Sequence, residues 1–151
     1  MANIILHPVA YIRNIRKEPI DDNWSGIEST IELIDELPAL SLDGIEAFSH
    51  LEILYSFHKS EKELPGSEHP RENKEFPKVG IFAQRKKDRP NHIGSTIVQL
   101  LRREGKSLFV KNLDSIDGTP VLDIKPVFKE FLPKGEVIQP EWVSILMKNY
   151  W

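Results

Sequence analysis

The sequence predicts a mainly β fold, with a single closed or nearly closed barrel of about six or seven strands and a short C-terminal helix. The first observation is that short segments with alternating apolar and polar residues follow one another along the chain, separated by turn-forming residues. The second is that strands so close in sequence tend to close into a barrel, because closure removes exposed edges. The third is that 151 residues with 40% hydrophobic content suffice for one core. We therefore expect one domain over residues 1–151, in which residues 128–151 form an extension that carries the helix.

Three strands and one helical turn are expected in the N-terminal half. Residues 4–12 (IILHPVAYI) are rich in strand-forming residues, and Pro8 favours an edge or bulged strand. Residues 27–34 (IESTIELI) and 49–58 (SHLEILYSFH) alternate between apolar and polar side chains, which indicates two half-buried strands. Between these two strands, residues 35–48 have room for one short helical turn.

Further strands are expected in the C-terminal half. VGIFA at residues 79–83 is typical of a short buried strand. Residues 95–113 have the pattern of a hairpin that turns at residues 104–106, where Gly105 is a turn former. VLDIKPVF at residues 121–128 predicts one more strand.

The C-terminal segment QPEWVSILMKNYW (139–151) suits a helix with Pro140 in its first turn and with Trp142, Ile145 and Leu146 on one face. Its aromatic and aliphatic side chains are a large apolar load for a chain end. Such a load either caps the core of the barrel or marks an interface with a second copy.

Composition excludes several classes of protein. The net charge of −3 argues against a surface that coats nucleic acid, so an anionic partner must meet a local basic patch. Without cysteine there is no disulfide framework and no thiolate metal site. No apolar run approaches the roughly 20 residues that span a bilayer. The N-terminus does not have the pattern of a signal peptide, and we expect a cytoplasmic protein without a membrane partner.

Two loops stand out. Residues 59–78 hold three prolines and many charges with little apolar periodicity, and a loop of this length is usually functional or mobile. In the second loop, Arg85, Lys86, Lys87 and Arg89 crowd together with one acidic residue to offset them. Mutual repulsion disfavours such a cluster unless solvent or an anionic ligand screens it. The loop is therefore either a solvated charged segment or a site for an anion.

Three carboxylates follow the predicted hairpin. Asp114, Asp117 and Asp123 lie within ten residues, where they either bind a cation or cap turns of their own loop. A metal site is disfavoured, because strand alternation sends these side chains in different directions. His50 and His58 lie about 26 Å apart along one strand, which excludes joint ligation of an ion. We expect no metal.

Three ordered blocks of the sequence together resemble a known family. They are DGIEAFSHLEILYSFH (43–58), GIFAQRKKDRPNHIG (80–94) and LDSIDGTPVLDIKP (113–126). These blocks resemble the signatures of the TsaA-like (TrmO) family, here in a short form that is expected not to carry the extra C-terminal domain. The resemblance implies a single-sheet β-barrel, usually dimeric, that binds S-adenosylmethionine. It also implies N6-methylation of a threonylcarbamoyl-modified adenosine beside the anticodon of threonine tRNA.

The resemblance also implies the site. The residues implied to bind the cofactor are Asp22, Asn23, Trp24, His58, Lys59, Arg85, Ser95, Asp114, Asp117, Gly118 and Thr119. Those implied to face tRNA are Lys86, Lys87, Arg89, Asn91 and His92. The carboxylate of the cofactor suits Arg85, and its sulfonium and ammonium groups suit Asp114 or Asp117. No catalytic side chain is assigned.

The chain departs from the family pattern at three positions inside the blocks. His92 replaces a proline, Gln84 replaces a threonine, and Glu52 stands where the family usually has tryptophan. Two of these substitutions lie in the loop where acceptor and cofactor should meet. Three hypotheses follow: a tRNA methyltransferase, a methyltransferase with a small-molecule acceptor, and a non-catalytic module that binds S-adenosylmethionine.

Overall fold

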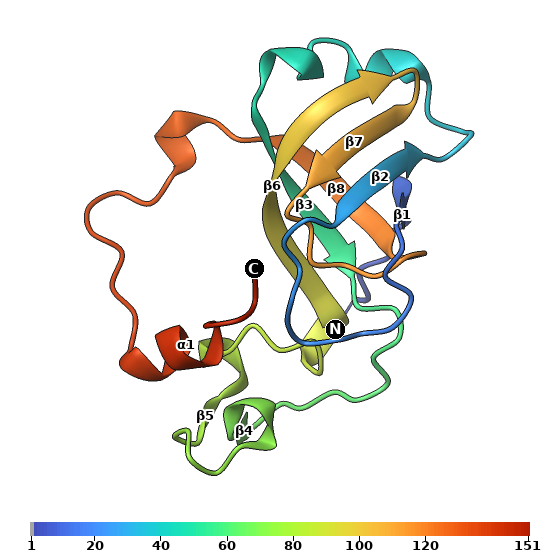
Figure 1. Ribbon diagram of the computed structural model, residues 1–151. Helices are drawn as coiled ribbons and strands as arrows, with labels where there is room; N and C mark the ends of the chain where they lie inside the picture. The colour runs from blue at the N-terminus through green and yellow to red at the C-terminus, as the bar shows by residue number, and fades with distance from the viewer. Residues whose placement is uncertain (1) are drawn as a thin grey trace.

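A computed structural model describes residues 2–151, and its centre is a closed barrel of six antiparallel strands (Figure 1). Around the barrel the strands follow the order β1-β2-β7-β6-β3-β8. Their bounds are β1 Ala10–Arg13, β2 Glu28–Leu33, β3 His50–Ser56, β6 Ile93–Glu104, β7 Ser107–Lys111 and β8 Pro120–Pro126. The predicted closed β-barrel is confirmed.

Alternation along the strands builds the core. On β3, Leu51, Ile53 and Tyr55 point inward and are at most 3% exposed, as the sequence pattern predicts. The predicted hairpin forms between β6 and β7, and Gly105 supplies the positive φ of 59° that its turn requires. Short 3-10 helices at Ala39–Leu42 and Ile45–Ala47 confirm the helical turn expected before β3.

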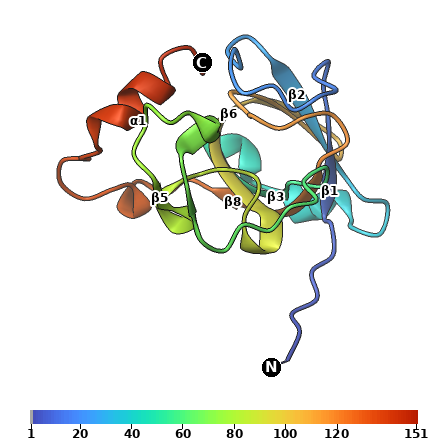
Figure 2. The same ribbon diagram turned by 90° about the horizontal axis from the view of Figure 1, so that it is seen from below.

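The remaining elements lie outside the barrel. Strands β4 (Ser67–Glu68) and β5 (Val79–Gly80) form a separate two-stranded sheet. The helix α1 (Glu141–Leu146) lies near this sheet, beyond one end of the barrel (Figures 1 and 2). Further 3-10 helices are Pro70–Glu72, Ile81–Ala83, Pro90–His92 and Lys129–Phe131. None of the helices within residues 2–151 is long and apolar enough to cross a membrane.

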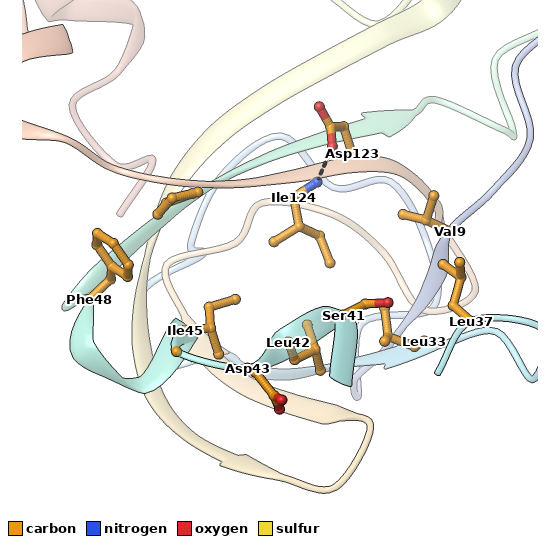
Figure 3. A pocket seen from close by; sticks show the side chains of 12 residues that line it. Val9, Leu33, Leu37, Ser41, Leu42, Asp43, Ile45, Phe48, Asp123 and Ile124 are labelled. Carbon is orange, nitrogen blue, oxygen red and sulfur yellow. Dashed lines mark hydrogen bonds between the residues drawn. The ribbon is translucent and has the colours of Figure 1, made fainter. Parts of the chain in front are cut away.

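The antiparallel order gives the barrel two ends of different character. At one end, here called the polar end, β1, β3 and β7 finish and β2, β6 and β8 begin. At the opposite end, here called the apolar end, the 3-10 helices of residues 39–47 cover the barrel. A recess of about 390 Å³ lies at the apolar end, and Figure 3 shows the mainly aliphatic side chains that line it, such as Leu33, Leu42 and Ile124.

Two strand predictions are wrong. The first strand begins at Ala10 rather than at residue 4, and the segment before it projects from the barrel with Ile4 87% exposed (Figure 2). Pro8 cannot donate a backbone hydrogen bond, so the ladder with β8 starts beside it, at the amide of Val9. The predicted strand at residues 79–83 has two strand residues and then a 3-10 turn, which leaves Phe82 79% exposed.

The C-terminal helix is shorter than predicted. Pro140 precedes α1 as its N-cap, because it has an extended ψ of 153°, and so it does not lie in the first turn. Trp142 packs near Phe76 with ring centroids 6.5 Å apart. Ile145 is 57% exposed, so the apolar face predicted for this helix is not buried along its whole length.

Candidate functional site

The polar end of the barrel is organised around one carboxylate, that of Asp114. The hydroxyls of Tyr55 and Thr96 both donate to its Oδ1, the first over 3.2 Å. The hydroxyl of Tyr150 donates to Oδ2. Asp114 comes from the loop after β7, held in place by its neighbour Leu113, which is fully buried in the core. Three separate parts of the chain therefore converge on this group.

Tyr55 reaches the carboxylate because of a glycine on the adjacent strand. It is the last inward-facing residue of β3, and it pairs directly with Gly94 on β6. A Cβ atom on Gly94 would lie 2.5 Å from the Tyr55 ring and 2.9 Å from Phe57. Only glycine leaves room for the Tyr55 ring against the adjacent strand. Packing therefore explains the glycine at position 94 in the second block.

Tyr150 arrives from the far end of the chain. The amide of Trp24 donates to the Tyr150 carbonyl over 2.8 Å, and the amide of Asn23 donates to Asn149 over 2.9 Å. These two backbone bonds fasten the C-terminal residues along the first loop. The Tyr150 ring packs edge-on against Trp151 with centroids 5.1 Å apart.

The electrostatics of this network keep both tyrosines protonated. Burial and the negative charge of Asp114 raise the pKa of Tyr55 far above its ordinary value. The same two causes raise the pKa of Tyr150. Both hydroxyls therefore remain hydrogen-bond donors throughout the physiological range. Among residues 2–151, no lysine, arginine or histidine forms an ion pair with Asp114.

Arg85 is the cationic side chain at the polar end that is best suited to bind an anionic group. Its guanidinium donates to the carbonyl of Ser95, next to Thr96 on β6. Its positive charge slightly opposes the rise in the pKa of Tyr150 that burial and Asp114 cause. Arg85 is exposed, so its other donors face solvent. The structure thus brings an exposed guanidinium to the same region as the Asp114 carboxylate, which has no ion-pair partner among residues 2–151.

The third block is fastened to the first loop by Asp117. This carboxylate accepts from the amide of Asn14 over 3.0 Å and from the Lys17 ammonium over 2.8 Å. The Lys17 hydrogen bond, followed by that of Asn14, lowers the pKa of Asp117. Thr119 is 2% exposed, and its hydroxyl donates to the carbonyl of Ile116. Thr119 stabilises its own loop, whereas Asp117 does not cap a turn of its own loop as predicted but accepts from Asn14 and Lys17 of the first loop.

His58 lies at the rim of the polar end. It follows β3, and its Nε2 lies 4.0 Å from the place that a Cβ on Gly118 would occupy. Gly118 has a positive φ of 83°, a backbone conformation that glycine adopts with the least strain. Burial, and then the charge of Lys59, lowers the pKa of His58. The first and third blocks therefore meet at His58. The lowered pKa favours the neutral form of its imidazole at neutral pH.

The first loop is held by two arginines that sequence reasoning did not select. The Arg16 guanidinium lies 4.1 Å from the centroid of the Trp24 ring and donates to the carbonyls of Asp22 and Asn23, each over 2.7 Å. Arg71 pairs with the Asp22 carboxylate over 2.8 Å, and this hydrogen bond raises the Arg71 pKa. Trp24 is only 3% exposed, so its ring packs within the fold while its backbone amide holds Tyr150.

Most of the basic loop is engaged with its own surroundings. Lys86 pairs with Glu68 of β4, and the Arg89 guanidinium donates to the carbonyl of Gln84 over 2.7 Å. Lys87 has no ion-pair partner among residues 2–151. It lines a recess of about 250 Å³ together with Lys59, Ser60, Glu61, Lys62 and Asp88. Contacts with other residues of the chain therefore offset most of the repulsion between the four cations of the basic loop.

The remaining two residues predicted to face tRNA determine the backbone path of the basic loop. Asn91 and His92 have positive φ angles of 66° and 49° and form the turn into β6. One ring nitrogen of His92 lies 2.7 Å from the carbonyl of Lys62. This contact joins the basic loop to the long loop of residues 59–78.

Sequence reasoning missed three of the four members of the Asp114 network. The sequence pattern identifies Tyr55 only as an apolar residue of its strand, Thr96 only as part of a hairpin, and Tyr150 only as apolar load at the chain end. A usable signal existed for Tyr55, since a tyrosine at the last inward position of a barrel strand needs a partner for its hydroxyl. No cluster of three or more potential metal ligands occurs in the described residues 2–151.

The comparisons with known proteins agree on one family. The model of the tRNA-methyltransferase O N-terminal domain matches residues 12–131. A probable S-adenosyl-L-methionine-binding protein of Methanothermobacter thermautotrophicus is 36% identical over 84% of this chain and 92% of its own length. A similar protein of Pyrococcus abyssi is 38% identical over 85% of this chain and 70% of its own length.

Longer proteins match as well. A human tRNA (adenine(37)-N6)-methyltransferase is 41% identical over 68% of this chain, but the match spans only 23% of the human protein. A crystal structure of TrmO from Pseudomonas aeruginosa superposes with a TM-score of 0.76 at 28% identity. That superposition covers 94% of this chain and 62% of the Pseudomonas chain.

Proposed function

Because the chain belongs to the tRNA-methyltransferase O N-terminal domain family, we propose that it is an S-adenosylmethionine-dependent methyltransferase that modifies N6 of an adenosine next to the anticodon of tRNA. One observation carries the proposal from the family to this chain. It is the carboxylate of Asp114, held by three hydroxyls and without a cationic partner within residues 2–151, in the same region as the exposed Arg85.

These residues fit the charges of the cofactor. When bound, S-adenosylmethionine supplies a methyl group on a positively charged sulfonium. A partly buried carboxylate that is hydrogen-bonded but not ion-paired attracts a cationic group, because its charge is incompletely compensated. Asp114 would therefore hold the sulfonium or ammonium side, and Arg85 would hold the carboxylate. Gly118 and His58 would line the neighbouring rim.

For tRNA, we propose the surface around Lys59, Lys62 and Lys87. These three lysines line the 250 Å³ recess together with Glu61 and Asp88, so the cations outnumber the anions there on a chain whose net charge is −3. Phosphate contacts of this kind give an affinity that falls steeply with salt. Lys86 and Arg89 would act on this surface indirectly, by holding the loop that presents Lys87.

The test is transfer of a labelled methyl group from S-adenosylmethionine to total tRNA. We expect label in tRNA that is lost after ribonuclease treatment, at a rate that falls as salt is raised. Turnover with small nucleosides but not with tRNA would favour a small-molecule acceptor, a reading that the engagement of Lys86 and Arg89 within the loop supports. Binding of the cofactor without turnover on any acceptor would leave a non-catalytic module.

We further propose that residues 1–151 act as one domain with 128–151 as its extension, in the cytoplasm and as a homodimer. Along the extension, Phe131 and Ile138 are both 84% exposed and Val137 is 69% exposed. Exposed apolar surface of this kind marks protein interfaces. Light scattering on the intact chain should give the mass of a dimer, and the double change Phe131→Ser with Ile138→Ser should give a monomer. An unchanged dimer would place the interface elsewhere.

A further inference from the structure

The residue that completes the Asp114 network lies outside the part of the chain that defines the family. The family model ends at residue 131, and Tyr150 comes from the segment after it. The chain leaves the barrel after β8, runs outward through the extension and returns with α1 beside the polar end (Figure 1). The chain thus returns over a long path to place the Tyr150 hydroxyl in a hydrogen bond with Asp114, a residue predicted to bind the cofactor. This arrangement requires an explanation.

Two independent sets of contacts fix Tyr150. Its backbone carbonyl accepts from the amide of Trp24, and the preceding carbonyl of Asn149 accepts from Asn23, so the segment is fastened without the side chain. The hydroxyl then donates to Asp114. Because the backbone alone anchors the segment, the hydroxyl is free for a separate role.

The distribution of donors on Asp114 suggests what that role is. Its Oδ1 accepts from both Tyr55 and Thr96, and its Oδ2 accepts from Tyr150. A carboxylate offers about four acceptor positions, two on each oxygen. Oδ1 is therefore filled, and one position is left on Oδ2. The hydroxyl of Tyr150 decides which of the two positions on Oδ2 stays open.

We propose that Tyr150 is a positioning residue of the cofactor site, whose hydroxyl orients Oδ2 of Asp114 so that its open acceptor position meets the positive charge of S-adenosylmethionine. The inference rests on the proposed function, because it requires the cofactor at Asp114. Tyr150 acts through Asp114 and stabilises bound cofactor without contributing to the chemical step. In the rival explanation, Tyr150 only anchors the C-terminal segment to the first loop.

A double-mutant cycle with S-adenosylmethionine as the probe separates the two explanations. Titration calorimetry compares the intact wild-type chain, Tyr150→Phe, Asp114→Asn and the double variant. Tyr150→Phe keeps the ring and the backbone bonds and removes one hydrogen bond to a charged group, so we expect the Kd to rise about tenfold. In the Asp114→Asn background the same change should alter the Kd less than about twofold, because the group it acts on is gone.

Tyr11→Phe is the matched control. Tyr11 lies on β1 between the fully buried Ala10 and Ile12, so its side chain points outward from the barrel. Removing this hydroxyl should leave the Kd unchanged. Thermal unfolding of every variant checks that the fold is intact, and Tyr150→Phe should shift the Tm no more than Tyr11→Phe does.

Each remaining outcome overturns a different statement. If the wild type binds and Tyr150→Phe binds equally well, the positioning role is wrong and the proposed function stands. If Tyr150→Phe weakens binding by the same factor with Asp114 or with asparagine at that position, Tyr150 is only an anchor. If the wild type does not bind S-adenosylmethionine saturably, the proposed function fails and the positioning role fails with it.

Discussion

The two ends of the barrel are stabilised by different kinds of interaction. At the apolar end, aliphatic side chains from β2, β8 and the 3-10 helices surround a recess of about 390 Å³, and Leu42 is 4% exposed among them (Figure 3). At the polar end, hydroxyls from three distant segments converge on Asp114. The first arrangement stabilises the fold through burial of apolar surface. The second places a poorly compensated charge in a half-buried position, which costs stability unless a ligand meets it.

This difference between the two ends predicts that some substitutions change the stability of the fold and others change the affinity for S-adenosylmethionine. Packing at the apolar end is needed for folding and is too far from Asp114 to influence a ligand directly. Hydrogen bonds at the polar end contribute less to folding, because a buried charge offsets part of their gain. Four changes test this division, in order of decreasing effect.

The largest effect is expected on stability, from Leu42→Ala. Removing a buried leucine side chain costs about 2–4 kcal/mol of unfolding free energy, because apolar contact is lost and a cavity is left. Chemical denaturation measures this cost, and the Kd for S-adenosylmethionine should stay within about twofold. The control is Leu40→Ala in the same 3-10 helix, since Leu40 is 69% exposed. A large change in Kd from Leu42→Ala would show that the two ends are coupled.

Asp114→Asn is the converse change. It removes the charge while nearly preserving shape, so we expect binding of S-adenosylmethionine to weaken by about 30-fold or more, near 2 kcal/mol. The Tm should change little or rise, because a partly buried charge is removed. Asp123→Asn provides the control at the apolar end, where that carboxylate pairs with Lys125 over 2.9 Å. Equal loss of binding in both variants would contradict a specific role for Asp114.

Gly94→Ala should affect both properties. The new methyl group would lie 2.5 Å from the Tyr55 ring, so the ring must move and the strand pairing must adjust. We expect a loss of about 1–3 kcal/mol in stability together with weaker cofactor binding. Gly66→Ala is the matched control, because a Cβ there would have no atom within 4 Å. Denaturation and calorimetry on the two variants decide, and wild-type binding by Gly94→Ala would separate Tyr55 from the site.

The sequence predicts the apolar end better than the polar end. Alternation along residues 49–58 identifies Leu51 and Ile53 as core, because one strand's own pattern reports which face is buried. The Asp114 network depends on contacts between segments distant in the chain, since Asp114 and Tyr150 are 36 positions apart. No local pattern reports such a contact. The family resemblance selects Asp114 and Arg85, but it cannot supply Tyr150, which lies beyond the residues that the family model matches.

The smallest expected effect is on the pH at which the Asp117 contacts, which hold the loops of the polar end together, are lost. Lys17, and then the amide of Asn14, lowers the pKa of this carboxyl below its ordinary value of 3.8. The contribution of Asp117 to stability is therefore fully present above about pH 3.8 and is lost as pH falls through the lower folded-state pKa. Nuclear magnetic resonance should show the amides near Asn14 and Gly118 changing in acid before the core amide of Leu51 does. Lys17→Met should move that change to higher pH, because the largest cause of the lowered pKa is removed. If the core amide changes together with the loop amides, the two ends unfold as one unit, and the polar end has no separate stability to lose.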